Sequence, residues 1–222
     1  MTTALTKKTK STYAISRRQR AGIITLCLLL AAVFIWLDQS LIRHRWRLRP
    51  KSEEQARAYD FEKYHAKIFT VVNVVDGDTI DIDVPDDQYS QTRMRLWGID
   101  TPETKSEEYG VMYFGQEATD FITKLAFGKQ VTVYLDNGNR TRDKYGRLLT
   151  FVKLLDNGFL NEVLVSEGFA YADLRFHHSF YNKYQQLEAS ARSLKKGLWG
   201  KVKRDQLPGW LQRERPNLLL EK

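Results

Sequence analysis

Residues 68–84 read IFTVVNVVDGDTIDIDV, and this stretch decides the fold class. Its first half is rich in β-branched residues, which favour strands. The Asp-Gly pair at 76–77 then breaks the run as a turn would. Between 79 and 84 apolar and acidic residues alternate with a period of two, which predicts Ile80, Ile82 and Val84 facing inward and the aspartates facing outward. The stretch therefore predicts two consecutive strands joined by a tight turn.

More strands and helices follow this pair along the chain. Apolar alternation or β-branched composition predicts strands at 93–99, 131–135 and 148–154. Helical spacing of apolar residues predicts a helix at 115–126, a second from an Asn161 cap to Glu167, and a third at 180–196. Five strands with helices inserted late predict a small α+β domain around a Greek-key barrel.

The net charge of +8 is unevenly distributed. Residues 1–64 hold 13 Lys/Arg against 5 Asp/Glu, whereas residues 65–222 hold 22 of each. The excess therefore belongs to the N-terminal part and indicates membrane contact or targeting more than it indicates the ligand of the folded part. Cys27 is the single cysteine, which excludes an intrachain disulfide and a cysteine-based zinc site.

The uncharged run 21–37 (AGIITLCLLLAAVFIWL) predicts a single transmembrane helix. Trp36 stands near its end, where an interfacial ring is expected, and no small-residue cleavage site follows. A removed signal peptide or a buried helix are the alternatives. Residues 1–20 form a basic tail and 38–64 a charged juxtamembrane stalk. Positive charge flanks the run on both sides, so it does not fix the orientation.

Three polar clusters in the predicted domain are candidates for chemistry: Asp-Gly-Asp-Thr at 76–79, Asp-Thr-Pro-Glu at 100–103, and RDKYGR at 142–147. Each alone fits a turn or a helix start. Arg95, five residues before Asp100, alone fits a strand-face ion pair. In combination they supply carboxylates and guanidiniums, the groups needed to hold one hard cation, orient one water and neutralise one phosphate.

The combination resembles the staphylococcal nuclease (thermonuclease) family over about 65–205. The matching motifs occur in order: VDGDT at 75–79, RLWGIDTPE at 95–103, YFGQEA at 113–118, RDKYGR at 142–147, NEVLVSEG at 161–168 and KKGLW at 195–199. The resemblance implies a five-stranded OB-fold barrel with three helices. It also implies Ca²⁺ as the cofactor and nucleic acid, both DNA and RNA, as the substrate.

Site residues are carried over from the matching motifs. The resemblance implies that Asp78, Asp100 and the backbone carbonyl of Thr101 bind the cation, with Asp76 nearby and outside the ligand set. Three further residues would act on the attacking water and on the phosphate. Glu103 would orient or deprotonate the attacking water, and Arg95 and Arg147 would hold the phosphate.

Nucleotide contacts match the family less completely. Tyr145 has a counterpart there, but the tyrosines that pack on the base do not, and Phe176 is the remaining candidate for stacking. His177 and His178 are predicted to lie in a solvated turn. Trp199 is predicted to fill the core under the last helix. The basic cluster late in the chain fits either a solvated face or a patch that contacts the phosphate backbone.

The sequence therefore predicts a membrane-anchored, calcium-dependent endonuclease in residues 65–205, followed by a C-terminal tail at 206–222. The alternative is a non-catalytic nucleic-acid-binding or protein-binding module tethered to a membrane. The N-terminus further resembles a fungal branch of the family, the mitochondrial membrane endonucleases, and residues 1–20 lack acidic residues as a mitochondrial presequence does. We expect a single-pass mitochondrial membrane protein. A signal anchor of the endoplasmic reticulum is the alternative.

Overall fold

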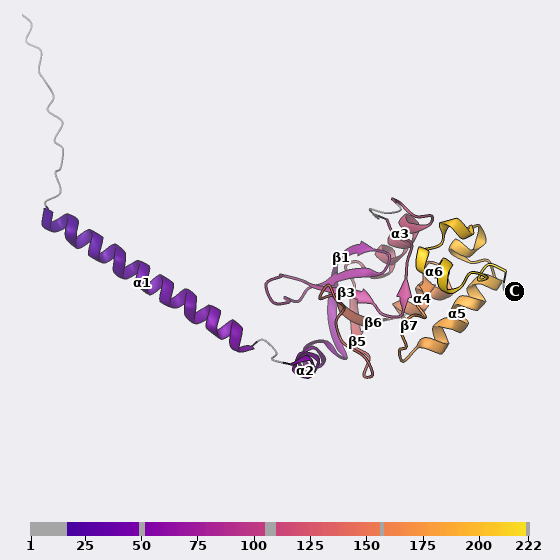
Figure 1. The fold of residues 1–222 in the computed structure, drawn as a ribbon, viewed down its shortest axis with the longest axis horizontal. Coiled ribbons are helices and arrows are strands. Elements are labelled where there is room, and N and C mark those ends of the chain that lie inside the picture. Colours follow the sequence, from indigo (N-terminus) through magenta and orange to yellow (C-terminus); the bar gives the residue numbers. More distant parts are fainter. Residues whose placement is uncertain (1–16, 49–51, 105–109, 156–157, 221–222) are drawn as a thin grey trace, which may run out of the picture. The chain divides into compact units, whose positions relative to one another are not determined.

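The computed structural model describes residues 17–48, 52–104, 110–155 and 158–220, and the chain divides into two compact units, Met1–Lys51 and Ser52–Lys222 (Figure 1). The first unit holds helix α1 (Arg17–Leu48). Its stretch Arg17–Trp36 is long and apolar enough to cross a membrane, a test that a signal sequence also passes. The predicted span 21–37 lies within α1, and residues 1–16 of the predicted basic tail lie outside the described residues.

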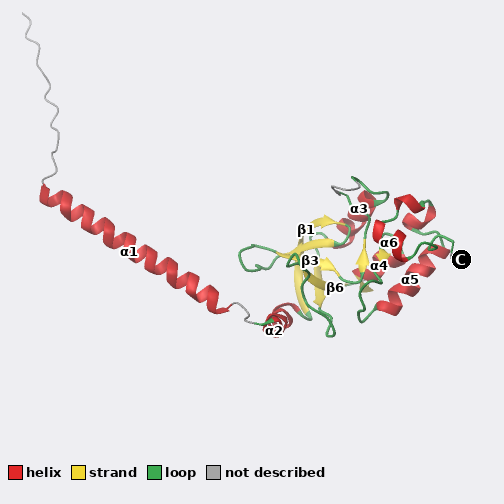
Figure 2. Cartoon of the chain, viewed as in Figure 1, coloured by secondary structure: helices red, strands yellow, loops and turns green. Residues whose placement is uncertain are grey.

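The second unit is built on a closed barrel of five strands (Figure 2). Its strands are β1 (Lys67–Asp76), β2 (Thr79–Ile82), β3 (Thr92–Leu96), β5 (Gln130–Tyr134) and β6 (Leu148–Leu154). Antiparallel pairs join them in the order β3-β2-β1-β5-β6, and a parallel pairing of β3 with β6 closes the barrel. A short strand β7 (Gly158–Phe159) pairs antiparallel with the end of β6. The predicted α+β class with an OB-type barrel is confirmed.

Strand β2 shows where the simple alternation rule holds and where it fails. Ile80 and Ile82 are fully buried, as predicted. Asp83 is exposed, whereas Asp81 lies on the outward face, as predicted, but is buried. The Arg93 side chain covers it from the neighbouring strand, with Nε donating to Asp81 Oδ1 over 2.9 Å. A long side chain on the next strand can thus bury a position that faces outward.

Three helices follow the barrel's first strands: α3 (Gly115–Ala126), α4 (Leu160–Ser166) and α5 (Tyr181–Ser193). Asn161 does not cap α4 as predicted, because Phe159 holds the cap position and Asn161 is fully buried inside the helix. Its side chain accepts from Val152 N and donates to the carbonyls of Trp97 and Thr150. Asn161 therefore fixes α4 to the barrel through hydrogen bonds to backbone groups.

A two-stranded ladder outside the barrel positions the residue at 100. Strand β4 (Ile99–Asp100) pairs antiparallel with β8 (Tyr171–Ala172), with Asp100 opposite Tyr171. Glu188 of α5 is fully buried and accepts a hydrogen bond from Ala172 N at 3.0 Å. The segment that carries Asp100 is thus fixed through β8 to the C-terminal helices.

Helix α2 (Glu53–Tyr64) begins at the Ser52 cap, which accepts from Gln55 N. We predicted a stalk through residue 64 and a domain that begins near 65. In the structure α2 belongs to the same compact unit as the barrel, and Tyr64 is fully buried in the barrel core. The folded unit therefore starts at Ser52.

The segment 206–222, which we named a C-terminal tail, is folded through its described part to residue 220. The turns η1 (Gly197–Gly200) and η2 (Arg204–Gln206) lead into helix α6 (Gly209–Glu214). Leu207, Leu211 and Leu218 form a second apolar cluster with Trp199, which is buried as predicted. This cluster holds α6 beside β8, where the C-terminal segment can reach Asp100.

Candidate active site

The Asp-Gly turn between β1 and β2 presses against the segment that follows β4. A Cβ atom at Gly77 would lie 2.7 Å from Thr101 Oγ1, so only glycine fits this approach. Asp78, the next residue, accepts hydrogen bonds at Oδ2 from both Thr101 N and Thr101 Oγ1, each at 3.0 Å. Two segments that are 23 residues apart in sequence therefore meet at one buried carboxylate.

Arg95 joins the two carboxylates that the sequence proposed as metal ligands. It lies on β3 opposite Thr79 of β2, which places it beside the Asp78 turn. Its Nη2 donates to Asp100 Oδ1 at 2.6 Å, and its Nη1 forms a close ion pair with Asp78 Oδ2. The direction of that second contact does not suit a hydrogen bond, so Nη1 is buried without a properly aligned acceptor. These contacts bring Arg95, Asp78 and Asp100 together at one place.

Asp100 has a partner that sequence reasoning missed. Trp210 of α6 donates its indole Nε1–H to Asp100 Oδ2 at 2.7 Å, across 110 positions of sequence. Arg175 lies over the Trp210 ring at 4.0 Å and is itself paired with Asp173. No motif marks Trp210, because a tryptophan in a short helix has no local pattern that ties it to an aspartate 110 positions away.

Arg147 belongs to a tight turn after Arg142. Asp143 holds this turn together by accepting from Tyr145 N, Arg147 N and Arg147 Nε, the last at 2.7 Å. Gly146 has a φ of +82°, a conformation that glycine adopts without strain. Arg147 Nη1 points toward Thr79 Oγ1 at 3.5 Å, which places this guanidinium on the same side of the barrel as Asp78.

Glu103 is exposed and lies within the electrostatic reach of the other site residues. Burial of part of the side chain raises its carboxyl pKa, the charge of Asp78 adds to the rise, and Arg95 and Arg147 oppose it. The pKa of the Glu103 carboxyl is thus affected by the charges of Arg95, Arg147 and Asp78. Its backbone is fixed, because Glu103 O accepts from Met112 N at 2.9 Å.

The acidic residues around Arg95 repel one another. Burial and the neighbouring Asp78 carboxylate raise the pKa of Asp76 to about 7. Burial also raises the pKa of Asp100 to about 6, although Arg95 opposes the rise. Burial first, and repulsion from Asp78 second, therefore disfavour the ionised forms of these two carboxyl groups. Added positive charge would therefore favour the ionised forms of these groups.

The donor set suits a hard cation by its chemistry. Carboxylate oxygens from Asp78 and Asp100 are the ligands that Ca²⁺ prefers, and the surplus negative charge favours a cation. Across the described residues, no three acidic, histidine or cysteine side chains form a ready-made metal cluster. Asp78 and Asp100 both form ion pairs with Arg95. These residues are chemically suited to bind a cation. In this structure the Arg95 guanidinium balances the negative charge of Asp78 and Asp100.

The predicted nucleotide contacts divide between two places. Tyr145 is exposed and lines a groove of about 480 Å³ together with Arg147 and Tyr89. Phe176 is not among the described residues that line this groove, and its ring packs 5.5 Å from Trp97. The structure therefore brings Tyr145 to the arginine turn and places Phe176 beside Trp97.

His178 does not lie in the solvated turn that the sequence predicted. It is 2 % exposed and is surrounded by aromatic rings, including Trp97, Phe151 and Tyr184. Its Nδ1 accepts from Phe180 N, and burial lowers its pKa to about 4. The prediction failed because two adjacent histidines look hydrophilic in sequence, whereas one of them fills the apolar rim of the barrel.

Comparison with known proteins identifies the family. The family model described as staphylococcal nuclease homologue matches residues 93–201. Thermonuclease of Staphylococcus hyicus is 35% identical over 132 residues, which cover 59% of this chain and 75% of the relative. An uncharacterized endonuclease of Escherichia coli O157:H7 is 34% identical over 151 residues, 65% of this chain and 84% of the relative. The chain belongs to the staphylococcal nuclease family.

The family assignment supports a nuclease function for this staphylococcal nuclease homologue. The matched range 93–201 includes Arg95, Asp100, Glu103 and Arg147, whereas Trp210 lies beyond it. The resemblance deduced from the sequence motifs is confirmed at the level of the family. Assignment to a fungal mitochondrial branch stays a prediction.

Proposed function

We propose that the chain is a membrane-anchored, calcium-dependent endonuclease that hydrolyses phosphodiester bonds of DNA and RNA. One observation carries the proposal. Arg95 bridges Asp78 and Asp100, while Glu103 senses the charges of both Arg95 and Arg147. Acidic and forked cationic groups from four separate segments therefore share one site, as phosphodiester hydrolysis requires.

Glu103 is the group best suited to act on the attacking water. It is exposed, so water can reach it, and its raised pKa makes it a stronger base than an ordinary carboxylate. The positive charges of Arg95 and Arg147 oppose that rise in pKa. We assign Glu103 the role of orienting the water and accepting its proton.

The two arginines would neutralise charge that grows on the phosphate in the transition state. A planar guanidinium can donate two parallel hydrogen bonds to phosphate oxygens. Arg95 holds its guanidinium between the Asp78 and Asp100 carboxylates, beside the proposed position of the phosphate. Arg147, with 28% of its side chain exposed, can approach from the groove side. Tyr145 beside Arg147 would contact the adjacent nucleotide, and Phe176 would stack only on a more distant one.

Asp78, Asp100 and the Thr101 carbonyl would hold the Ca²⁺ ion, with Asp76 beside them. When bound, this ion supplies Lewis acidity toward the scissile phosphate. The protein's own part is to keep the two carboxylates fixed, which Thr101 does for Asp78 and Trp210 does for Asp100.

The apolar stretch of α1 supports a membrane anchor through residues 21–37. An N-terminus of 20 residues without acidic side chains supports a mitochondrial membrane, and an endoplasmic reticulum signal anchor is the alternative. Expression of the chain with a C-terminal fluorescent label, followed by fractionation with carbonate extraction, tests both parts. Recovery in the soluble fraction would contradict the anchor.

The cleavage assay uses residues 52–222, the compact unit of the structure. We expect single-stranded DNA and RNA to be cut with Ca²⁺ and cutting to stop with a chelator. The family resemblance implies 5′-hydroxyl and 3′-phosphate ends. Binding of oligonucleotides without cleavage under any divalent cation would support the alternative, a non-catalytic binding module.

A further inference from the structure

Helix α2 is held to the barrel by polar groups on its buried face. Asp60 is 2 % exposed and accepts from Thr141 Oγ1 at 2.7 Å. Tyr64, one turn later, shares a hydrogen bond of 3.0 Å with Thr92 Oγ1. Arg57 donates to the Asn139 carbonyl at 3.2 Å. The helix that precedes the barrel therefore contacts the loop that leads into the Arg147 turn.

Arg142 is the centre of this contact, and each of its N–H groups has an acceptor. Nε and Nη2 donate to the Asp60 carboxylate at 2.9 and 2.8 Å. Nη1 and Nη2 donate to Asp86 at 2.6 and 3.1 Å, and Nη1 also donates to the Gly146 carbonyl at 3.0 Å. A guanidinium with five fixed donors can join three segments in this way, whereas a lysine could not.

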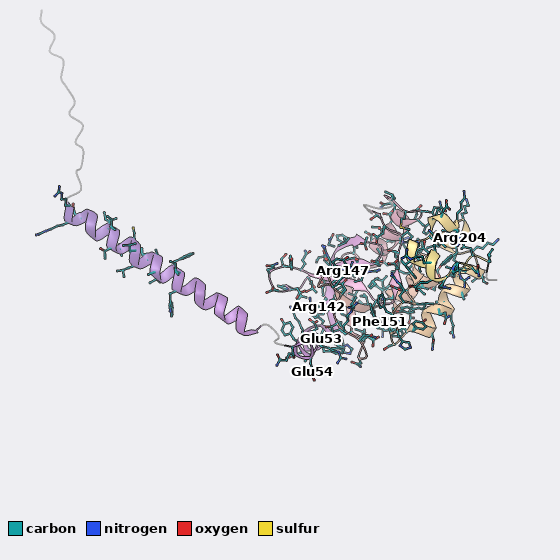
Figure 3. All side chains as sticks on the ribbon, viewed as in Figure 1. Glu53, Glu54, Arg142, Arg147, Phe151 and Arg204 are labelled. Atoms are coloured by element: carbon teal, nitrogen blue, oxygen red, sulfur yellow. The ribbon has the colours of Figure 1, made fainter. Side chains whose placement is uncertain are left out.

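Gly146, which accepts from Arg142, is the residue immediately before Arg147 in the chain. Arg142 and Arg147 are both labelled in Figure 3. The base of the loop is fixed by a hydrogen bond from Leu149 N to Thr141 O. Within the turn, Asp143 holds Arg147, and Asp143 N donates to Arg147 O. Arg142 joins the tip of this turn to α2 through the Gly146 carbonyl. The position of Arg147 therefore depends on Asp60 through one intermediate side chain.

We propose that Asp60 of α2 is a positioning residue that fixes the Arg147 turn through Arg142. The helix preceding the barrel is then part of the active-site support. Asp60 orients Arg142, Arg142 fixes the Gly146 carbonyl, and the turn presents the Arg147 guanidinium toward Thr79 and the Asp78 turn. This inference deepens the proposed nuclease function and rests on it for its kinetic consequence, whereas its structural part stands independently.

The test compares Asp60→Asn with Asp136→Asn in the full chain in detergent micelles. Asp136 is the control, because it is also a buried aspartate that accepts hydrogen bonds, in its case from Gly138 N and Ser179 N, each at 2.9 Å. The first readout is the ¹H–¹⁵N signal of Arg147 Nε, assigned by its loss in Arg147→Lys. We expect Asp60→Asn to shift or broaden this signal and Asp136→Asn to leave it in place.

The second readout is kinetic. Asp60→Asn should lower kcat about 10- to 100-fold with little change in KM, because misplacing a group that acts in the transition state reduces turnover. In the Arg147→Lys background the same substitution should lower kcat by less than about twofold, since residues that act through one another are not additive. Arg142→Lys should reproduce the signal change by a second route if Asp60→Asn fails to fold.

An unmoved Arg147 signal in folded Asp60→Asn or Arg142→Lys would overturn the proposal. So would an equal loss of kcat in both backgrounds, or an equal displacement of the signal by Asp136→Asn. If the unsubstituted chain does not cleave nucleic acid, the proposed function fails, and the Arg147 signal alone then decides whether Asp60 positions the turn.

Discussion

The two sides of the candidate site are built differently. The strand side (Asp78, Arg95 and Asp100) is mostly buried, and its members hydrogen-bond to one another and to the backbone of adjacent elements. The loop side (Glu103 and Arg147) is more exposed and lies on turns. On the strand side, the side chains that we propose for the chemistry therefore also hold the fold together. On the loop side, the side chains that we propose for the chemistry should have little effect on folding.

Arg95→Met should have the largest effect, because it removes the charge that compensates two buried carboxylates. We expect a loss of about 3–5 kcal/mol in the free energy of unfolding, together with loss of detectable cleavage. Urea unfolding followed by tryptophan fluorescence measures the first effect. Arg93→Met is the control on the same strand. Arg93→Met breaks the ion pair with Asp81, in which the arginine side chain is 53% exposed. It should lower the free energy of unfolding by clearly less than Arg95→Met does. Equal losses in the two variants would contradict the proposed role of burial.

Glu103→Gln tests the loop side at its carboxylate. The change keeps the volume and removes the proton acceptor, so cleavage should fall by about 10²- to 10⁴-fold. Stability should stay within about 0.5 kcal/mol, because the side chain is exposed. Single-turnover cleavage and urea unfolding of the same preparation give both numbers. Full activity in this variant would remove Glu103 from the mechanism.

Arg147→Lys tests the loop side at its guanidinium. A point charge cannot replace the fork, so kcat should fall by about 10²- to 10³-fold while stability stays within about 0.5 kcal/mol. Lys144→Ala removes a neighbouring cation from the same turn and should leave kcat nearly unchanged. If both variants lose activity equally, the turn contributes only its net charge.

His178 sharpens the comparison because it is buried but takes no part in the proposed chemistry. Its folded pKa of about 4 lies below the ordinary value of 6.5, so its contribution to stability is complete above pH 6.5 and is lost as the pH falls toward 4. In His178→Gln the acid-induced loss between pH 7 and 4 should be smaller by on the order of 2 kcal/mol. Urea unfolding at several pH values measures the difference. Identical pH profiles would show that His178 is protonated without cost.

The sequence predicted the parts of the molecule whose signals are local. The VDGDT turn, the period-two strands and the spacing from Arg95 to Glu103 each lie within a few residues, and the structure brings these segments together. It did not reveal the support from Asp60 or Trp210. Both contacts join segments about 80 or more positions apart, and both partners lie in segments that read as charged surface. Such contacts depend on how elements pack, which short patterns do not encode.

The Trp210 contact has a consequence for the order in which the site is assembled. During synthesis the barrel leaves the ribosome before α6 does, so Asp100 obtains its indole partner only after residue 210 has emerged. Until then the Asp100 carboxylate has the hydrogen bond from Arg95 Nη2 but lacks the one from the Trp210 indole.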